Sequence, residues 1–222
     1  PRGIELARPP PLRERLDRGS DRVGYDLWVK RDDLTGGALT GNKIRKLEFL
    51  LAEARTEGAD TVITCGGVNS NHARATAVAC ARLGFRCQLV LRGAAGRPAT
   101  GNLLLDRWAG ADIEFIGVED WPRVNDIMAG HAARRQAEGG RAYVVPEGGS
   151  NGLGAMGYVH AAFELREDAA AAGIELGRVV HALGSGGTTA GLALGFALAG
   201  ATAVEIVGVC VCDDAATFAP KI

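Results

Sequence analysis

Apolar strand-like segments and helix-like segments alternate regularly along this chain of 222 residues from residue 60 onward. The strand-like segments are short and rich in Val, Ile and Leu, and longer segments rich in Ala and Leu separate them. The expected strands cover residues 61–65, 86–91, 112–116, 142–145, 179–183 and 204–211, and the expected helices cover 71–83, 101–109, 121–138, 154–172 and 189–199. This alternation is typical of α/β proteins and predicts open, mostly parallel twisted sheets with helices on both faces.

Glycine-rich loops follow three of the expected strands, at residues 66–70, 147–152 and 184–188. Because ligands of such sheets bind beyond the carboxyl ends of the strands, we expect the three loops to open on one ligand site. The third loop precedes an apolar helix, an arrangement that can hold a phosphate through backbone N–H groups. It has neither the Gly-Lys-Ser/Thr end of a Walker A loop nor the third glycine of the dinucleotide fingerprint. The phosphate-binding candidates are Gly184, Ser185, Gly186, Gly187 and Thr188.

A lysine, Lys43, stands directly after a glycine-rich turn at residues 35–41 and begins an expected amphipathic helix. Only four of the 25 basic residues are lysines, and of these Lys43 has the most constrained setting. Lysine is the side chain that forms Schiff bases with carbonyl compounds such as pyridoxal phosphate (PLP). A lysine held in this way, together with a phosphate loop of no nucleotide-binding type, indicates PLP as the cofactor.

The loop after the first of these strands ends in Ser70, Asn71 and His72. Ser70 or Asn71 can cap the following helix. Alternatively, the Ser70 hydroxyl relays a proton and the Asn71 amide holds a phenolate-like oxygen of a ligand. His72 either supports the loop from the helix face or touches the substrate. Gly149, in the second glycine-rich loop, belongs either to an ordinary connection or to a wall of the site where backbone approaches the ligand.

The net charge and the cysteine and histidine positions limit which partners, disulfides and metal sites we expect. The net charge of −1 offers no basic field for nucleic acid, and no apolar run is long enough to span a bilayer. The first residues lack the apolar core of a signal peptide, so we expect a cytoplasmic protein. The odd number of cysteines, five, argues against a disulfide framework, and the scattered histidines predict no metal site.

Five motifs in order along the chain carry a family resemblance. They read Lys-Arg-Asp-Asp-Leu-Thr-Gly at 30–36, Gly-Asn-Lys-Ile-Arg-Lys-Leu-Glu at 41–48, Gly-Gly-Val-Asn-Ser-Asn-His at 66–72, Pro-Glu-Gly-Gly-Ser-Asn at 146–151 and Gly-Ser-Gly-Gly-Thr at 184–188. Taken together, they resemble the D-cysteine desulfhydrase / 1-aminocyclopropane-1-carboxylate deaminase family. The resemblance implies PLP fold type II, the fold of the tryptophan synthase β-subunit, with two sheets.

By this resemblance, Lys43 carries PLP as a Schiff base and Asn42 is the family's asparagine before that lysine. Asn71 lies beside the 3-hydroxyl of the cofactor, and Ser70 lies near the substrate. Residues 184–188 surround the cofactor phosphate. The implied reaction converts D-cysteine to pyruvate, hydrogen sulfide and ammonia, because His72 matches desulfhydrase members, whereas deaminase members more often have glutamine there. Deamination of 1-aminocyclopropane-1-carboxylate and lysis of L-cysteate are the alternatives. A catalytically silent PLP-binding homologue or fragment is a further alternative.

The resemblance also implies a division into two domains, and we expect an oligomer. We expect a large PLP-binding domain of residues 1–47 and 156–222, a small α/β domain of residues 48–155, and a homodimer. Family members continue further at the carboxyl end, where they supply a residue that stacks on the cofactor ring and a partner for its pyridine nitrogen. We therefore expect this chain to be incomplete at that end.

Overall fold

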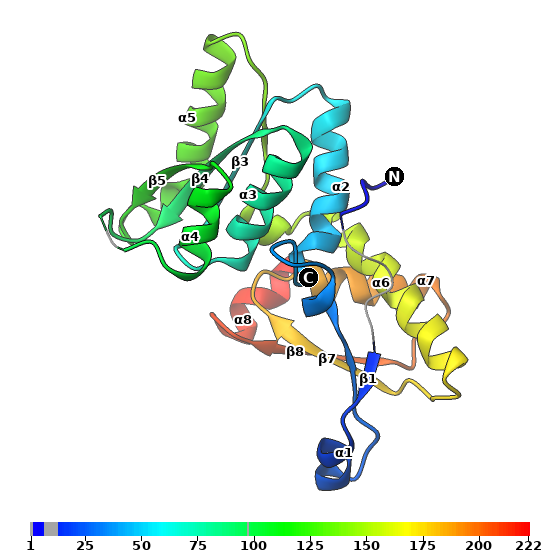
Figure 1. Cartoon of the computed structure of the whole chain (residues 1–222). Coiled ribbons are helices and arrows are strands. Elements are labelled where there is room, and N and C mark those ends of the chain that lie inside the picture. The colour runs from blue at the N-terminus through cyan, green and yellow to red at the C-terminus, as the bar shows by residue number, and fades with distance from the viewer. Residues whose placement is uncertain (1, 7–12, 97) are drawn as a thin grey trace.

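The computed structural model of the chain describes residues 2–6, 13–96 and 98–222. Figure 1 shows two lobes joined by long helices. The strands are β1 (Arg13–Arg15), β2 (Trp28–Lys30), β3 (Thr61–Gly67), β4 (Arg86–Arg92), β5 (Asp112–Ile116), β6 (Ala142–Val144), β7 (Arg178–Leu183) and β8 (Glu205–Cys210). The α-helices are α1 (Asp17–Val23), α2 (Lys43–Thr56), α3 (Asn71–Leu83), α4 (Gly101–Trp108), α5 (Val124–Ala137), α6 (Gly152–Ala171), α7 (Gly187–Leu198) and α8 (Ala215–Phe218).

One lobe is built on a four-stranded parallel sheet in the order β5-β4-β3-β6. Its central strands, β3 and β4, are largely buried, in keeping with their apolar composition. Val62 and Leu89 belong to a core shared with α2 and α3 on one face, whereas Ile63 and Val90 pack with Met128 of α5 on the other. The expectation of a parallel sheet with helices on both faces is confirmed for this lobe.

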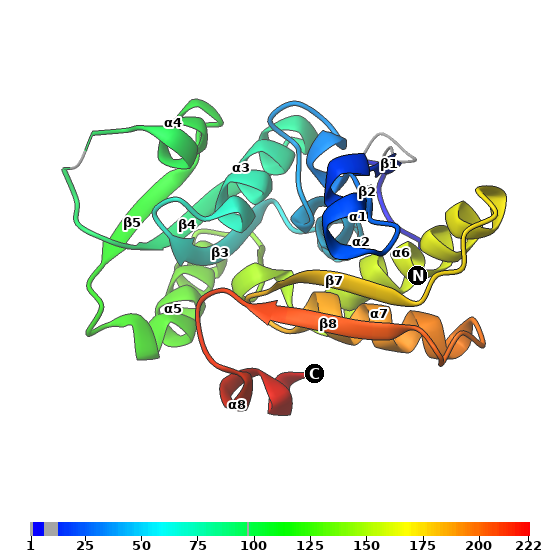
Figure 2. The ribbon, with the colours of Figure 1, turned by 90° about the horizontal axis from the view of Figure 1, so that it is seen from below.

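The other lobe contains the parallel pair β7–β8, with α6 and α7 packed behind it (Figure 2). Small residues allow α7 to approach α6 closely, because a Cβ at Gly195 would lie 2.6 Å from Ala162 Cβ. On the strand pair, Val180 and Val209 are 61% and 52% exposed, so the sheet face that carries them is uncovered. Helices thus cover one face of this pair.

Helix α2 contacts both lobes. Ile44 and Leu47 are fully buried in the core of the four-stranded sheet. The first turn of the helix rests on α6 at Gly157, where any Cβ would overlap the Arg45 carbonyl and lie 2.9 Å from the Lys46 nitrogen. The position of the α2 amino terminus is therefore fixed by backbone-to-backbone packing.

The helices and strands agree with most of the segments expected from the sequence, within one to three residues at their ends. The expected helix at 121–138 begins instead as a 3-10 turn, Trp121–Arg123, which contains Pro122, and continues as α5 from Val124. The antiparallel pair β1–β2 and helix α1 were not expected as a unit. The division at residues 47/48 and 155/156 stays a prediction, and both positions lie inside helices, α2 and α6.

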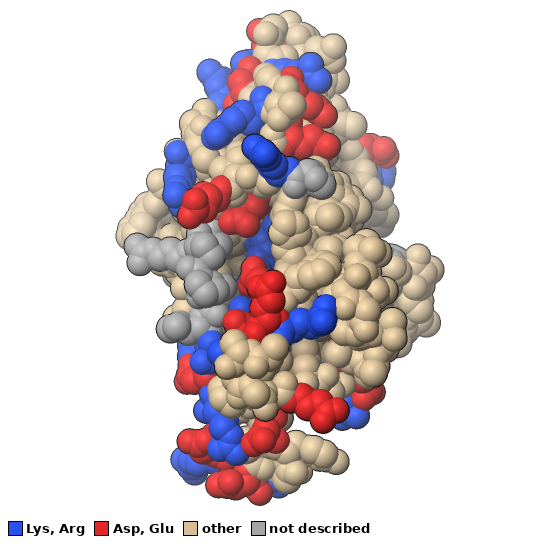
Figure 3. All heavy atoms as spheres, turned by 90° about the vertical axis from the view of Figure 1, so that its right-hand side faces the viewer, with Lys and Arg blue, Asp and Glu red and all other residues tan. Residues whose placement is uncertain are grey.

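The surface and the helices give two further facts. In the face drawn in Figure 3, Lys and Arg are interspersed with Asp and Glu, with no large area of one sign. Within the described part of the chain, every helix is too short or too polar to cross a bilayer.

Candidate active site

The loops after β6 and β7 meet above the first turn of α2. Ser150 and Ser185 share a hydrogen bond of 2.7 Å between their hydroxyl oxygens. Lys46 donates to the Ser150 hydroxyl at 2.9 Å and to the Gly148 carbonyl at 3.3 Å. The first turn of α3, which follows the loop after β3, lies alongside, since the His72 ring is 3.5 Å from the position of a Cβ at Gly149. The three segments therefore lie together, as expected, and their opening on one ligand site stays a prediction.

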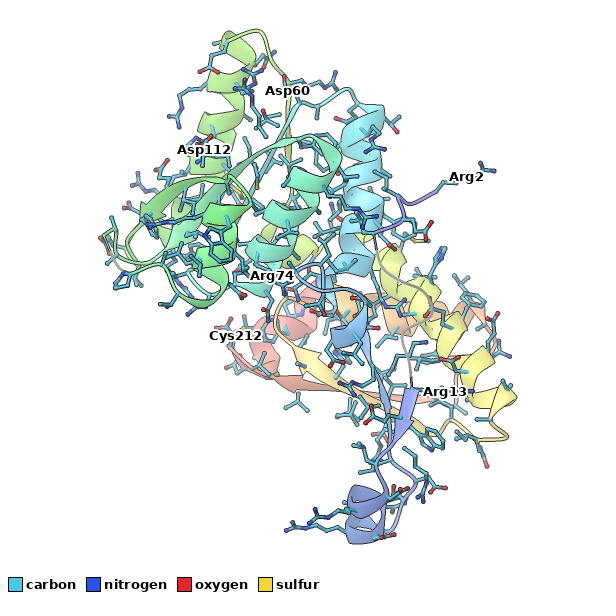
Figure 4. The ribbon with its side chains drawn as sticks, viewed as in Figure 1. Arg2, Arg13, Asp60, Arg74, Asp112 and Cys212 are labelled. Carbon is cyan, nitrogen blue, oxygen red and sulfur yellow. The ribbon has the colours of Figure 1, made fainter. Side chains whose placement is uncertain are left out.

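Lys43 is the first residue of α2 and is partly buried beside these loops. Its ammonium donates to Asn42 Oδ1 at 3.3 Å. Burial lowers the pKa of Lys43, and the nearby Cys212 thiol opposes this change. Cys212 follows β8 and donates through its thiol to the Gly184 carbonyl at 3.4 Å, which places it at the edge of the same site (Figure 4). A lysine in this setting has a larger neutral, nucleophilic fraction than an exposed one.

Lys46, three residues further along α2, is a site residue that the sequence reasoning missed. Its side chain is 1% exposed and both of its hydrogen-bond partners are neutral. Burial, followed by the charge of Lys43, lowers the pKa of Lys46 to about 7. The signal in the sequence was the spacing: residues i and i+3 lie on the same helix face, and Lys43 and Lys46 are two of only four lysines.

The loop at residues 184–188 leads directly into α7 and has the form of an anion cradle. Gly186 has φ of +86°, which only glycine adopts without strain, and Gly187 opens the helix. A Cβ on Gly187 would lie 2.8 Å from Ser150 Oγ and 2.9 Å from Lys46 Nζ, so the space over this glycine is lined by a hydroxyl and a cation. Thr188 is buried next to it. A helix amino terminus, a hydroxyl and an uncompensated buried ammonium together suit a phosphate group.

Ser70 caps α3, because its hydroxyl accepts a hydrogen bond from the Ala73 N–H at 3.2 Å. The loop is tight at this point: a Cβ on Gly66 would lie 2.6 Å from Ser70 Oγ. The capping interpretation of Ser70 is thus correct. A cap uses only an acceptor lone pair of the hydroxyl, so the O–H remains available as a donor, and a chemical role for Ser70 stays a prediction.

His72 is buried and its protonation is set by its neighbours. Thr64 donates its hydroxyl hydrogen to the Val145 carbonyl at 2.9 Å, so its oxygen must accept the 2.9 Å hydrogen bond from His72 Nε2–H. Burial, then the charges of Lys43 and Lys46, lower the pKa of His72 to about 3. The ring is therefore neutral, with the proton on Nε2. Among the described residues Nδ1 has no partner. The expected contact of His72 with substrate stays a prediction.

An ion-pair network around the buried Arg45 holds the first turn of α2 against α6. Arg45 donates to Asp32 and, through both terminal nitrogens at 2.9 Å, to Glu164 of α6. Tyr158 donates to the same Asp32 at 2.8 Å. Burial alone would lower the pKa of Arg45, but the hydrogen bonds to Glu164 and Asp32 outweigh it and raise the pKa. The guanidinium thus stays charged and ties α2 to α6 directly behind Lys43.

The chain is similar in sequence to a known protein family and to individual members of it. Residues 5–222 match the family described as "Pyridoxal-phosphate dependent enzyme". The chain is 46% identical over 192 residues to a putative 1-aminocyclopropane-1-carboxylate deaminase of Thermotoga maritima, covering 86% of this chain and 61% of the relative. It is 43% identical over 224 residues to a D-cysteine desulfhydrase of Klebsiella pneumoniae, covering 99% of this chain and 67% of that protein.

A solved structure described as an ACC deaminase homologue superimposes with a TM-score of 0.90 at 36% identity, covering 99% of this chain and 66% of that one. The chain thus spans between 61% and 67% of the length of these three relatives. The expected fold type and the expected family agree with these matches. The chain belongs to the family of pyridoxal-phosphate dependent enzymes.

Proposed function

We propose that the protein is a PLP-dependent lyase or deaminase that acts on a small amino acid, with D-cysteine as the first candidate substrate. The observation that carries the proposal is the pair of lysines on the first turn of α2: Lys43 faces the site, and Lys46 lies buried at the phosphate loop. A covalent cofactor that carries a phosphate needs one amine for its aldehyde and a positive environment for its phosphate. The two lysines and the cradle at Gly186 and Gly187 supply both.

The residues of this chain fit PLP in defined roles. Lys43 would hold the cofactor covalently, and Lys46, Ser150 and the amino terminus of α7 would bind its phosphate. An anion at this position would also compensate the buried charge of Lys46. Asn71 would donate to the oxygen on the ring. When bound, PLP acts as an electron sink for a carbanion formed at the α-carbon of the substrate.

Proton transfer would then fall to Lys43 and Ser70. Burial lowers the pKa of Lys43, so its free amine would serve as the base for the proton on the α-carbon of the substrate. Ser70, at the amino terminus of α3, would bind the substrate carboxylate or relay a proton. The overall reaction consumes D-cysteine and one water and releases pyruvate, hydrogen sulfide and ammonia.

Deamination of 1-aminocyclopropane-1-carboxylate is the second candidate, and the similarity to the Thermotoga maritima relative favours it. The two reactions differ in their products: only D-cysteine yields sulfide, whereas both substrates yield ammonia. L-cysteate, which would release sulfite, is a third substrate to distinguish.

A turnover screen of the PLP-loaded protein tests the proposal. D-cysteine, L-cysteine, 1-aminocyclopropane-1-carboxylate and L-cysteate are supplied separately, and ammonia, sulfide, sulfite and keto acid are measured. We expect sulfide and pyruvate from D-cysteine. Ammonia from 1-aminocyclopropane-1-carboxylate alone would replace the first candidate with the second. PLP binding without turnover of any of the four would favour a catalytically silent homologue.

A further inference from the structure

The amino terminus of α4 contacts the loop that carries Ser70 and Asn71. Asn102, in the first turn of α4, donates through Nδ2 to the Asn69 carbonyl at 2.7 Å and to Asn71 Oδ1 at 2.9 Å. No motif in the sequence pointed to Asn102. It is nevertheless the one described residue of α4 whose side chain hydrogen bonds to this loop.

The orientation of the Asn71 amide follows from this pair of hydrogen bonds. The Asn69 carbonyl can only accept, so the Asn102 atom facing it must be the NH2 group. The second hydrogen of that NH2 group points at Asn71, and the atom that receives it must be the amide oxygen. Arg74, which can only donate, lies 3.5 Å from the same oxygen. Two donors from two helices therefore fix Asn71 Oδ1 on the side of α4.

Arg74 is itself held firmly, so it contributes a fixed donor. Its side chain is buried and donates to the carbonyls of Ala38 and Thr40, in the turn before α2. Figure 4 shows Arg74 between the two lobes, near the start of α2. With the oxygen of Asn71 engaged by Asn102 and Arg74, the NH2 group of Asn71 is directed away from α4. No described residue accepts a hydrogen bond from it.

We propose that Asn102 is a positioning residue that orients the Asn71 amide so that its NH2 group, not its oxygen, meets the ring oxygen of PLP. This inference rests on the proposed function, in which Asn71 stands beside that oxygen. A phenolate oxygen carries negative charge and needs a donor. An Asn71 amide turned by 180° would present its own oxygen to the phenolate, so the interaction would change from attraction to repulsion.

The test compares three changes at this contact. Asn102→Asp keeps the shape but replaces the donor by an acceptor, and so favours the reversed Asn71 amide. Asn102→Ala removes the donor without supplying an acceptor, and serves if the aspartate variant does not fold. Arg107→Ala, an exposed position on the same helix, is the matched control. Each protein is titrated with PLP, and the dissociation constant and the visible absorption spectrum are recorded, with the melting temperature of the cofactor-free protein.

We expect Asn102→Ala to weaken PLP binding roughly three- to tenfold, because the Asn71 amide loses one of the two donors that fix its orientation, and to shift the visible band and its pH titration. Asn102→Asp should produce a larger change in the same direction, and Arg107→Ala none. Because Asn102 acts through Asn71, the Asn71→Ala/Asn102→Ala double variant should resemble Asn71→Ala alone.

The outcomes separate this inference from the proposed function. If the unmodified protein develops no visible PLP band, the proposed function fails, and the inference fails with it. If the band forms but both Asn102 variants match the control in affinity and spectrum, only the role of Asn102 is overturned. Additive effects in the double variant would also overturn it, because they would mean that Asn102 acts on the fold independently of Asn71.

Discussion

Ser70 has one role that the structure shows and one that we propose: its hydroxyl caps a helix, and the same hydroxyl is the proposed proton relay of the candidate active site. Its oxygen accepts from Ala73, which makes it the amino-terminal cap of α3. A capping residue at the carboxyl end of a parallel strand also faces the position where ligands of such sheets bind. Stability and catalysis are therefore separate readouts for this residue.

Replacing Ser70 by Ala and by Asn separates the two roles. Ser70→Ala removes the cap and the hydroxyl, and should cost ~1 kcal/mol of stability. Asn is as good a cap as Ser but has no hydroxyl, so Ser70→Asn should retain most of the stability. If Ser70 relays a proton, both variants should lose roughly 10²–10⁴-fold in kcat with PLP still bound. Nearly normal kcat in the well-folded Asn variant would show that Ser70 is a cap only.

Asp106 predicts a pH dependence of stability. It is fully buried, and neither carboxylate oxygen has a hydrogen-bond partner within the described chain. Burial raises the pKa of Asp106 from 3.8 to about 7, with the Arg74 charge acting in the opposite direction. Between these values the folded state holds a proton that the unfolded state has released. The contribution of Asp106 to stability should therefore fall as pH rises from about 4 to about 7.

The Asp106→Asn variant should remove this dependence. Relative to the unmodified protein, its free energy of unfolding should rise by on the order of 4 kcal/mol between pH 4 and pH 8. Asp112→Asn is the matched control, because it removes the same charge from an exposed position of the same lobe (Figure 4). Parallel stability curves for the Asp106 variant and the control, from denaturant titrations at each pH, would contradict the assignment.

At the scale of elements, the close contact between α2 and α6 sets the position of Lys43. Gly157→Ala would push its Cβ into the Arg45 carbonyl, and backbone cannot yield as a flexible side chain can. We expect a loss of about 1–3 kcal/mol in stability and weaker PLP binding, because the first turn of α2 must move. Gly130→Ala, inside α5 with nothing within 4 Å, is the control and should stabilise by roughly 0.5–1 kcal/mol. A Gly157→Ala variant as stable as the Gly130→Ala variant would contradict this account.

Local patterns in the sequence were sufficient for the elements of the parallel sheets, because apolar strands and glycine-ended helices are local signals. They also selected Lys43 and the loop at residues 184–188 as candidates, since the glycines of such a loop are contiguous, and the roles of both stay predictions. Lys46, Arg74 and Asn102 escaped notice because their roles depend on contacts with residues distant in sequence. Lys46 meets Ser150, and Asn102 meets Asn71, and no local pattern records either contact.

At the scale of the molecule, the two lobes meet where α2 begins, and every residue assigned to the cofactor lies at that junction. The lobe of the four-stranded sheet contributes Ser70 and Asn71, the β7–β8 lobe contributes the loop proposed to bind phosphate, and α2 contributes both lysines. The arrangement makes the identity of the reactive lysine the central claim. Lys43 and Lys46 both have lowered pKa values, so on this ground alone either side-chain amine could react with the cofactor aldehyde. Lys43 is the accessible one, whereas Lys46 is held by Ser150 and Gly148.

Borohydride reduction of the PLP-loaded protein, followed by tryptic peptide mapping, tests this claim directly. Reduction fixes the cofactor on its lysine and blocks cleavage there, so the label itself defines the peptide. We predict a labelled peptide of residues 32–45, with Lys43 in its interior, and no label in a Lys43→Ala variant. Label on residues 46–55 would assign the cofactor to Lys46, and label on residues 23–31 would assign it to Lys30. Either result would contradict the account of this site.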